Sequence, residues 1–259
     1  MKNLLGGALV WILIVSATPA LGADYDWTGV YVGVNAGVGV NDSKYRIQTD
    51  IRDPLPGFAE TNGLREENQN LNDTAFTGGA QAGYNWHVNR FVLGVELDFN
   101  YNGVDQTSIV DRPLASPLAG NVIYHASQRF DWFGTVRGRL GVTALPQWLV
   151  YATGGLAYGH VSSETTGFFT ATEDRYAGSG SATLPGWTVG AGSEWGISPA
   201  WSAKLEYLYV DLGTFSYTSE CVNCLANGIT NGPFLRTDVT TREHIVRFGL
   251  NYRFGGGSR

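Results

Sequence analysis

The chain has few charged residues and, after its first residues, no long apolar run. Only 15% of the 259 residues are Asp, Glu, Lys or Arg, against about 25% in soluble domains. Beyond residue 22, no apolar run reaches the roughly 18 residues that a membrane-spanning helix needs. This excludes a helical membrane protein. It does not exclude a membrane β-barrel, because barrel strands need only about 9–11 residues with every second one apolar.

The chain also lacks an excess of positive charge. It carries 17 Lys and Arg against 23 Asp and Glu, a net charge of −6. Nucleic acids bind basic protein surfaces, so we expect no nucleic-acid partner. What is abundant is glycine, with 35 residues, and aromatic side chains, with 13 Tyr, 12 Phe and 8 Trp. This composition favours paired strands, because each glycine costs a helix about 1 kcal/mol.

The N-terminus predicts export from the cytoplasm. Lys2 supplies a positive charge, residues 4–15 are apolar, and small residues surround Gly22. This order is typical of a signal peptide, which we expect to span residues 1–22. The alternative is an uncleaved anchor helix. Cleavage leaves a domain over residues 23–254 and a short tail over residues 255–259.

Eight segments of the remaining chain alternate between apolar and small or polar residues. A β-strand points successive side chains to opposite faces, so each segment predicts a strand with one apolar face. The segments cover residues 30–40, 76–88, 93–101, 132–142, 148–159, 187–197, 201–209 and 246–254.

The connections between these segments alternate in length. Three are tight turns, near Asn89, over residues 144–147 and over residues 198–200. Four are long and polar, and they cover residues 41–73, 104–127, 164–185 and 214–242. An even number of strands with short periplasmic turns and long external loops is typical of outer-membrane barrels. We therefore predict an all-β fold, an eight-stranded antiparallel up-and-down transmembrane β-barrel with four long external loops.

Alternation alone leaves open a soluble sandwich or lipocalin-like barrel with the apolar face inside. The aromatic residues at the segment ends favour lipid outside, because such residues form girdles at membrane interfaces. They are Trp27, Trp86, Tyr101, Trp132, Trp148, Tyr158, Trp187, Trp201, Tyr209 and Tyr252. The abundance of glycine on the polar face also suits a narrow, crowded interior.

The strand sequences resemble those of a known family, the small OmpA-like outer-membrane proteins of alphaproteobacteria, often labelled outer membrane immunogenic or porin-family proteins. The similarity covers nearly the whole chain after the signal peptide. The stretches that carry it are Trp27–Gly37, Gly78–Trp86, Phe91–Glu96, Trp132–Gly141, Tyr151–Gly159, Gly186–Gly192, Trp201–Asp211 and Val246–Phe254.

This resemblance implies an eight-stranded barrel in the bacterial outer membrane, with a role in envelope integrity or as a surface antigen. It also implies assembly by the outer-membrane insertion machinery, and it brings no catalytic residues and no cofactor. Family members end on an aromatic residue that acts as a sorting signal, which corresponds to Phe254 here. This chain continues with Gly255–Arg259, which is either a natural extension or a non-native remnant.

Charged residues recur on the polar face, where a barrel points its side chains inward. Neighbouring strands lie about 4.8 Å apart, so acids and bases on successive strands can pair. We expect a lumen network that fixes the geometry more than it adds net stability. The alternative is a narrow ion path or gate, and no substrate pocket supports acid–base catalysis. The predicted network contains Glu96, Asp98, Arg137, Arg139, Glu194, Lys204, Glu206 and Arg247.

His160 with Ser162 or Ser163 and Glu164 is similar to the Ser, His and acid arrangement of membrane-embedded lipid A hydrolases, although a polar strand end feeding a loop explains the same residues.

Cys221 and Cys224 lie in the last long connection. In an oxidising compartment they predict a small disulfide. A redox motif is the weaker alternative, because no βαβ pattern surrounds them. Two cysteines are too few for a structural zinc site, so no metal is expected.

The sequence thus predicts a structural outer-membrane protein that supports the envelope and presents surface loops. A small-diameter porin is the alternative, and a lipid A-modifying enzyme is a third hypothesis. Expected partners are outer-membrane lipids and lipopolysaccharide, which the mixed charges of the first loop could bridge, and we expect a monomer. The basic residues of that loop are Lys44, Arg46, Arg52 and Arg65.

Overall fold

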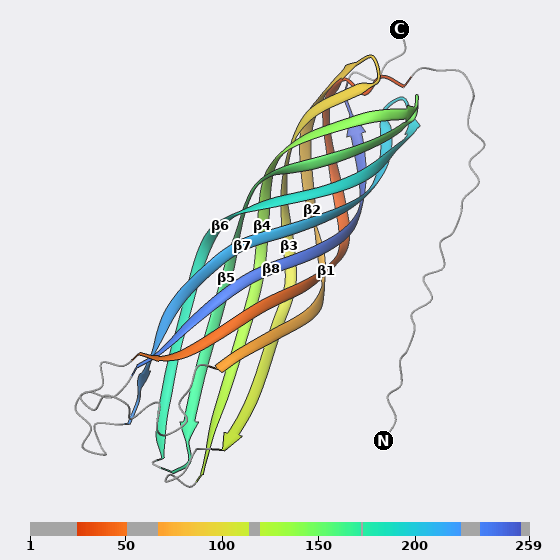
Figure 1. Cartoon of the computed structure of the whole chain (residues 1–259). Helices are drawn as coiled ribbons and strands as arrows, with labels where there is room; N and C mark the ends of the chain where they lie inside the picture. Colours follow the sequence, from red (N-terminus) through yellow and green to blue (C-terminus); the bar gives the residue numbers. More distant parts are fainter. Residues whose placement is uncertain (1–24, 51–66, 114–119, 172, 224–233, 255–259) are drawn as a thin grey trace, which may run out of the picture.

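The computed structural model describes residues 25–50, 67–113, 120–171, 173–223 and 234–254. These residues form one closed barrel in which each strand pairs with its neighbours in the sequence, and β1 pairs with β8 (Figure 1). The eight strands are β1 (Gly29–Asp50), β2 (Glu67–Val88), β3 (Phe91–Pro113), β4 (Asn121–Leu145), β5 (Trp148–Phe169), β6 (Asp174–Ser198), β7 (Trp201–Cys221) and β8 (Phe234–Arg253). All pairings are antiparallel.

Two-residue turns join β2 to β3, β4 to β5 and β6 to β7. Asn89 adopts a φ of 58° in the first of them, a conformation that asparagine tolerates better than most residues. The predicted eight-stranded antiparallel up-and-down barrel and the three tight turns are confirmed. In the described residues, no helix is long and apolar enough to cross a membrane.

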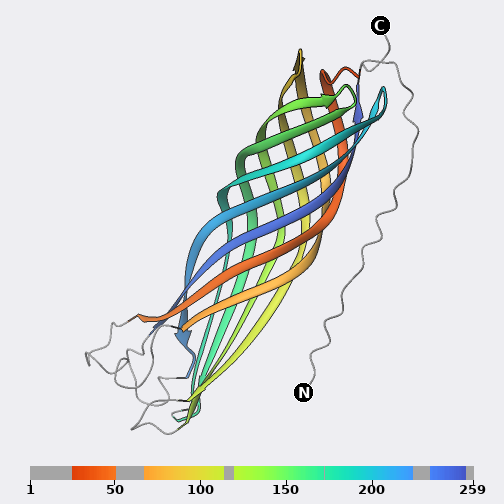
Figure 2. The same cartoon turned by 45° about the vertical axis from the view of Figure 1, so that its right-hand side comes forward.

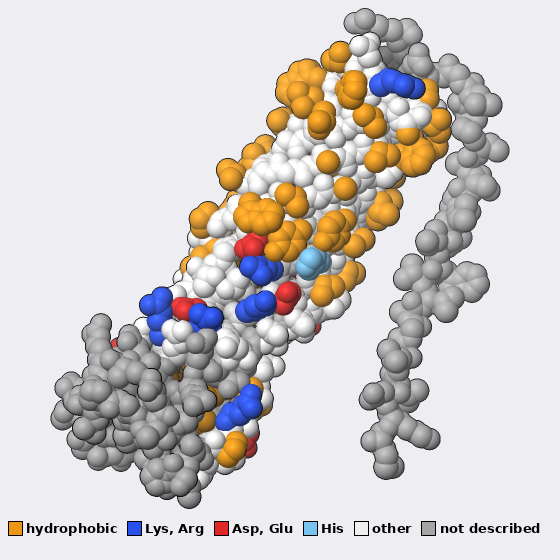
Figure 3. All heavy atoms as spheres, in the orientation of Figure 1, with side chains coloured by type: hydrophobic (Ala, Val, Ile, Leu, Met, Phe, Trp, Pro, Cys, Tyr) orange, Lys and Arg blue, Asp and Glu red, His pale blue; other side chains and the backbone are white. Residues whose placement is uncertain are grey.

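An apolar band surrounds the half of the barrel nearer the tight turns. Its side chains point outward and remain exposed, among them Val34 at 61%, Leu93 at 56% and Leu205 at 58%. Figure 3 shows hydrophobic side chains dominating this part of the visible face, with acidic and basic side chains beyond it. An outer face of this kind fits lipid rather than water.

The strands are much longer than a membrane requires. β4 and β6 each contain 25 residues and extend about 80 Å at 3.3 Å per residue, whereas an apolar band is about 25 Å tall. We call the half of the barrel farther from the tight turns the distal half. It incorporates most of the residues expected in long loops, so that expectation is wrong. Only residues 170–173 join β5 to β6, for example.

The strands extend because the alternation pattern inverts along them, as β8 illustrates. Near the tight turns, Val246 and Phe248 are exposed and Arg247 is buried. In the distal half, Leu235 and Val239 are buried, whereas Arg236 points outward. The distal half is therefore built like a water-soluble β-protein, with its apolar residues inside.

Two β-bulges lie where the apolar band ends. One shifts the register of β3 and β4 between Tyr101 and Val104, and at the same level the register of β4 and β5 shifts between Phe130 and Trp132. The other shifts β7 and β8 after Asp211, where Gly213 has a φ of 70° that suits glycine. Bulges bend and twist a strand, so both mark a change in the shape of the barrel.

The barrel wall opens at two places in the distal half. Pairing between β2 and β3 ends at Thr77 and Asn102. Pairing between β6 and β7 is interrupted between Ala177 and Trp187. We call the first opening the β2/β3 seam, and Figures 1 and 2 show the ends of these two strands diverging there. The distal half thus consists of two four-stranded sheets, β3–β4–β5–β6 and β7–β8–β1–β2, which rejoin where Tyr176 of β6 pairs with Cys221 of β7.

The inner faces of these two sheets pack against each other. Tyr45 of β1 and Tyr217 of β7 both lie 3.0 Å, hydroxyl to hydroxyl, from Ser163 of β5. Beyond them, a buried apolar cluster joins Ile47 and Leu235 to residues of the opposite sheet. The lumen is flattened here, and apolar contacts and tyrosine hydroxyls connect its two walls.

Candidate functional site

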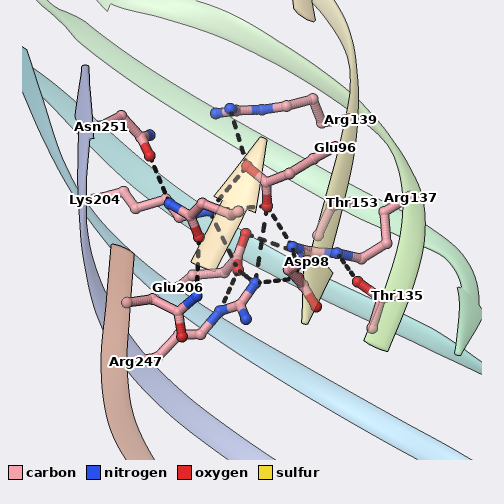
Figure 4. A network of polar contacts seen from close by, with 12 residues as sticks. Glu96, Asp98, Thr135, Arg137, Arg139, Thr153, Lys204, Glu206, Arg247 and Asn251 are labelled. Carbon is pink, nitrogen blue, oxygen red and sulfur yellow. Dashed lines mark hydrogen bonds and ion pairs between the residues drawn. The ribbon is translucent and has the colours of Figure 1, made fainter. Parts of the chain in front are cut away.

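Eight charged side chains meet inside the apolar band, and we call them the ion-pair cluster; Figure 4 labels all of them except Glu194. All point inward because they occupy the alternate positions of strands whose other face is apolar. None of their side chains is more than 3% exposed. They are Glu96 and Asp98 on β3, Arg137 and Arg139 on β4, Glu194 on β6, Lys204 and Glu206 on β7, and Arg247 on β8.

Some of these contacts join neighbouring strands, as the sequence suggested. Glu96 is the register partner of Arg137, and the two side chains form an ion pair. Glu206 is the register partner of Arg247, whose Nη2 lies 2.6 Å from the Glu206 carboxylate.

Other contacts cross the lumen. Lys204 has Glu194 as its register partner, yet its Nζ donates to both carboxylate oxygens of Glu96 at 2.9 Å. Glu194 instead accepts from Arg139 Nη2 at 2.6 Å. The remaining cross-lumen ion pairs are Arg247 Nη2–Asp98 Oδ2 at 2.8 Å, Arg137 Nη1–Glu206 Oε1 at 3.2 Å and Arg247 Nη2–Glu96 Oε1 at 3.8 Å.

Two tyrosines complete the cluster, and the sequence analysis did not identify them as part of it. Tyr31 donates to Glu96 at 2.7 Å, and Tyr151 donates to Glu206 at 2.9 Å. The Arg139 guanidinium lies 4.0 Å from the centroid of the Tyr151 ring, a cation–π contact. Both tyrosines lie on the polar face of their predicted segments, and this position is the sequence feature that could have placed them in the lumen.

Neutral hydrogen bonds hold Glu194 as well. Ser202 donates to its Oε1 at 2.6 Å, and Asn251 Nδ2 donates to the same oxygen at 2.9 Å. Glycine makes room for the long side chains nearby. A Cβ at Gly94 would approach Arg139 Cγ to 2.8 Å, and one at Gly249 would approach Lys204 Cγ to 2.9 Å.

The cluster contains four acids and four bases, so its formal charge balances. Burying ions is costly, and pairing with additional hydrogen bonds offsets that cost. Such a set can hold strands in register and occupy space. In the described residues, no group of three or more His, Cys, Asp or Glu side chains could hold a metal ion.

Aromatic residues lie at the mouth of the barrel next to the tight turns. Trp27 is only 2% exposed, and its Nε1 donates to the Pro146 carbonyl at 3.1 Å. Tyr25 packs on Trp27, and the Arg253 guanidinium lies 4.4 Å from the Tyr25 ring centroid. The prediction that Trp27 belongs to the outer girdle is therefore wrong, because the chain folds inward before β1 begins.

Of the residues similar to a lipid A hydrolase, Ser163 faces the lumen and the other three face outward. Ser163 points inward, where it contacts Tyr45 and Tyr217. His160, Ser162 and Glu164 occupy the alternate, outward positions, and His160 Nδ1 lies 3.3 Å from Thr183 Oγ1.

Phe254 follows the end of β8 and points outward with 52% exposure. Its N–H donates to the Val30 carbonyl at 2.9 Å, which fixes it to the start of β1. The proposed signal peptide and residues 255–259 lie outside the described residues. Cys221 ends β7 and is disulfide-bonded. Cys224 lies outside the described residues, so the Cys221–Cys224 pairing stays a prediction.

Comparison with known proteins agrees with this geometry. The family model described as "Outer membrane protein beta-barrel domain" matches residues 8–254. The chain belongs to this family. It is therefore an outer-membrane protein, as predicted, and the apolar band is its lipid-facing surface.

Named relatives come from alphaproteobacteria. The 31 kDa outer-membrane immunogenic protein of Brucella melitensis is 38% identical over 239 residues, which cover 89% of this chain and 85% of the relative. The 22 kDa outer membrane protein of Rhizobium leguminosarum bv. viciae is 33% identical and covers 76% of this chain and 75% of its own. The solved outer membrane protein OprG of Pseudomonas aeruginosa aligns with a TM-score of 0.49 at 13% identity, covering 90% and 100% of the two chains.

Proposed function

We propose that the protein is a non-enzymatic structural barrel that strengthens the outer membrane and displays its distal half as a surface antigen. The observation that carries the proposal is the ion-pair cluster. Eight buried charges balance one another inside the apolar band, with side-chain exposures of 3% or less. A lumen occupied in this way leaves no path for ions. The function we propose therefore depends on the stable barrel wall in the membrane and on the surface exposed beyond it.

Two other layers support an occupied lumen. On the side of the tight turns, Trp27 and Leu149 belong to a buried aromatic and aliphatic cluster. On the distal side, Phe130, Phe133 and Leu208 belong to a larger apolar cluster, and each is 0% exposed. A porin would need a continuous polar channel through all three levels.

The display role rests on the distal half and on the relatives. Short turns face the periplasm in this class of barrel, which places the distal half outside the cell. Its strands carry outward polar residues well beyond the apolar band, so it projects as a folded platform. Two relatives of this chain are named immunogenic proteins, and we extend that role to this protein.

We further propose that lipopolysaccharide binds the charged surface directly beyond the apolar band. Arg242 and Asp211 pair there at 3.0 Å, and nearer the distal end of β8 Arg236 pairs with Asp238 at 3.0 Å. Lys44 is also exposed outward. Arg52 and Arg65 of the first connection lie outside the described residues. Guanidinium groups suit phosphate recognition. We also propose that the outer-membrane insertion machinery assembles the protein as a monomer, which leaves this surface free to bind lipopolysaccharide.

Deletion of the gene tests the structural role. The strain is expected to become sensitive to detergent and to recover when the wild-type protein or a His160→Ala variant is restored. Failure of the wild-type protein to restore resistance contradicts the structural role. A requirement for His160, together with altered lipid A masses in cells that overproduce the protein, supports the enzyme hypothesis instead.

A further inference from the structure

A single acid stands apart from the ion-pair cluster, on its distal side. Glu243 of β8 points inward and is 1% exposed. Its Oε2 accepts a hydrogen bond from Asn102 Nδ2 at 2.7 Å. Its other carboxylate oxygen, Oε1, has no hydrogen-bond partner in the part of the chain that the structure describes.

Glu243 has no basic partner among the described residues. Among the described residues, no Lys or Arg forms an ion pair with Glu243, whereas every acid of the cluster has one. Arg247, the nearest inward base on the same strand, pairs with Asp98 and Glu206. The inward side chains next to Glu243 are uncharged: Asn41 and Val210 are its register partners on β1 and β7, Asn102 of β3 is its hydrogen-bond partner, and Thr241 and Ile245 flank it on β8. A buried carboxylate without a counter-charge is strongly unfavourable.

The neutral side chains around it offer further free oxygen atoms. Asn102 Oδ1 and Gln128 Oε1 are buried and have no hydrogen-bond partners among the described residues. Gln128 belongs to the same layer because its Nε2 donates to Thr241, two residues before Glu243, at 2.9 Å. Asn41, the register partner of Glu243 on β1, has one free donor, Nδ2. The layer therefore has three free acceptors against one free donor.

Gly39 on β1 leaves the space for the free carboxylate oxygen. A Cβ at this position would collide with Glu243 Oε1. The layer also lies at the foot of the β2/β3 seam, because Asn102 is the last residue of β3 that pairs with β2. The seam is thus the nearest break in the barrel wall.

We propose that Glu243, Asn102 and Gln128 form a binding site for a dehydrated monovalent cation, Na⁺ or K⁺. Hard cations take oxygen ligands from carboxylates and amide carbonyls. One carboxylate neutralises one positive charge, so a monovalent ion leaves the layer neutral. Ca²⁺ prefers six to eight oxygens, and a divalent ion would leave one charge uncompensated.

The test measures thermal unfolding of the protein, purified in detergent, in NaCl, KCl or choline chloride at equal ionic strength. Choline is too large to enter the site. At about a hundredfold the dissociation constant, Na⁺ or K⁺ is expected to raise Tm by on the order of 5 °C over choline, and to do so saturably. Glu243→Gln should abolish this difference. Glu164→Gln, which alters an outward carboxylate, should preserve it.

Asn102→Ala provides a second variant should Glu243→Gln fail to fold. Loss of one neutral ligand is expected to raise the half-saturating cation concentration about tenfold. Equal Tm values of the wild-type protein in the three salts overturn the proposal. A cation response that persists in Glu243→Gln or is unchanged in Asn102→Ala also overturns it. So does a Tm that depends on pH alone, because a proton then neutralises Glu243.

Discussion

Lys204 reaches across the lumen to Glu96 and donates to both of its carboxylate oxygens at 2.9 Å. Its register neighbour is Glu194, so the preference for Glu96 depends on the shape of the whole barrel. Strands β7 and β3 are held at a fixed separation by this contact. The barrel is therefore braced through its interior as well as by its backbone ladders.

The first prediction concerns this brace. Glu96→Gln or Lys204→Met alone leaves a buried charge without its partner, and we expect each to lower the free energy of unfolding by about 3–5 kcal/mol. The double variant should lose less than the sum, since neither partner is left alone. Urea unfolding in detergent measures these values. Glu164→Gln serves as the control and should change stability by about 0.5 kcal/mol or less. Additive losses in the double variant would count against a direct Lys204–Glu96 interaction.

The second prediction concerns the packing of the two distal sheets. Val239 is 0% exposed, and Val239→Asp places an unpaired charge between the sheets at a cost of about 4 kcal/mol or more. We expect limited proteolysis to cleave the distal half of this variant while the fragment in the apolar band stays intact. Thr218→Asp, at an outward position of β7, should resist cleavage like the wild-type protein. Equal resistance of both variants would mean that the distal half has no packed interior.

The third prediction concerns the β2/β3 seam. Between Phe91 and Tyr101, β3 pairs with strands on both sides, whereas from Val104 to Pro113 it pairs only with β4. Every second amide of the latter segment lacks a ladder partner and should exchange with deuterium much faster than those of the former. NMR-detected exchange measures this difference. Uniform protection along β3 would show that the seam is closed.

The sequence predicted the part of the fold that lies in the membrane better than the part outside it. Period-two alternation with an apolar outer face identified residues such as Val246 and Arg247 correctly. In the distal half the same strands carry Leu235 and Val239 inside and Arg236 outside. A search for outward apolar residues therefore assigns these segments to loops.

The alternation pattern likewise predicted part of the candidate site. The side-chain period placed all eight charged residues in the lumen, but it could not specify the cross-lumen contact of Lys204 with Glu96. Such contacts depend on strand tilt and shear, which no local pattern encodes. Glu243 lay beside a segment assigned to a loop, so its burial could not be predicted either.

The most direct test of a closed structural barrel is electrical conductance across planar lipid bilayers. The wild-type protein, whose Arg137 and Arg247 side chains are 0% exposed, is expected to show no steady conductance above that of a mock preparation. An Arg137→Ala and Arg247→Ala double variant serves as a comparison in which the cluster is weakened. Reproducible ohmic channels of constant size from the wild-type protein would contradict the account and establish a porin.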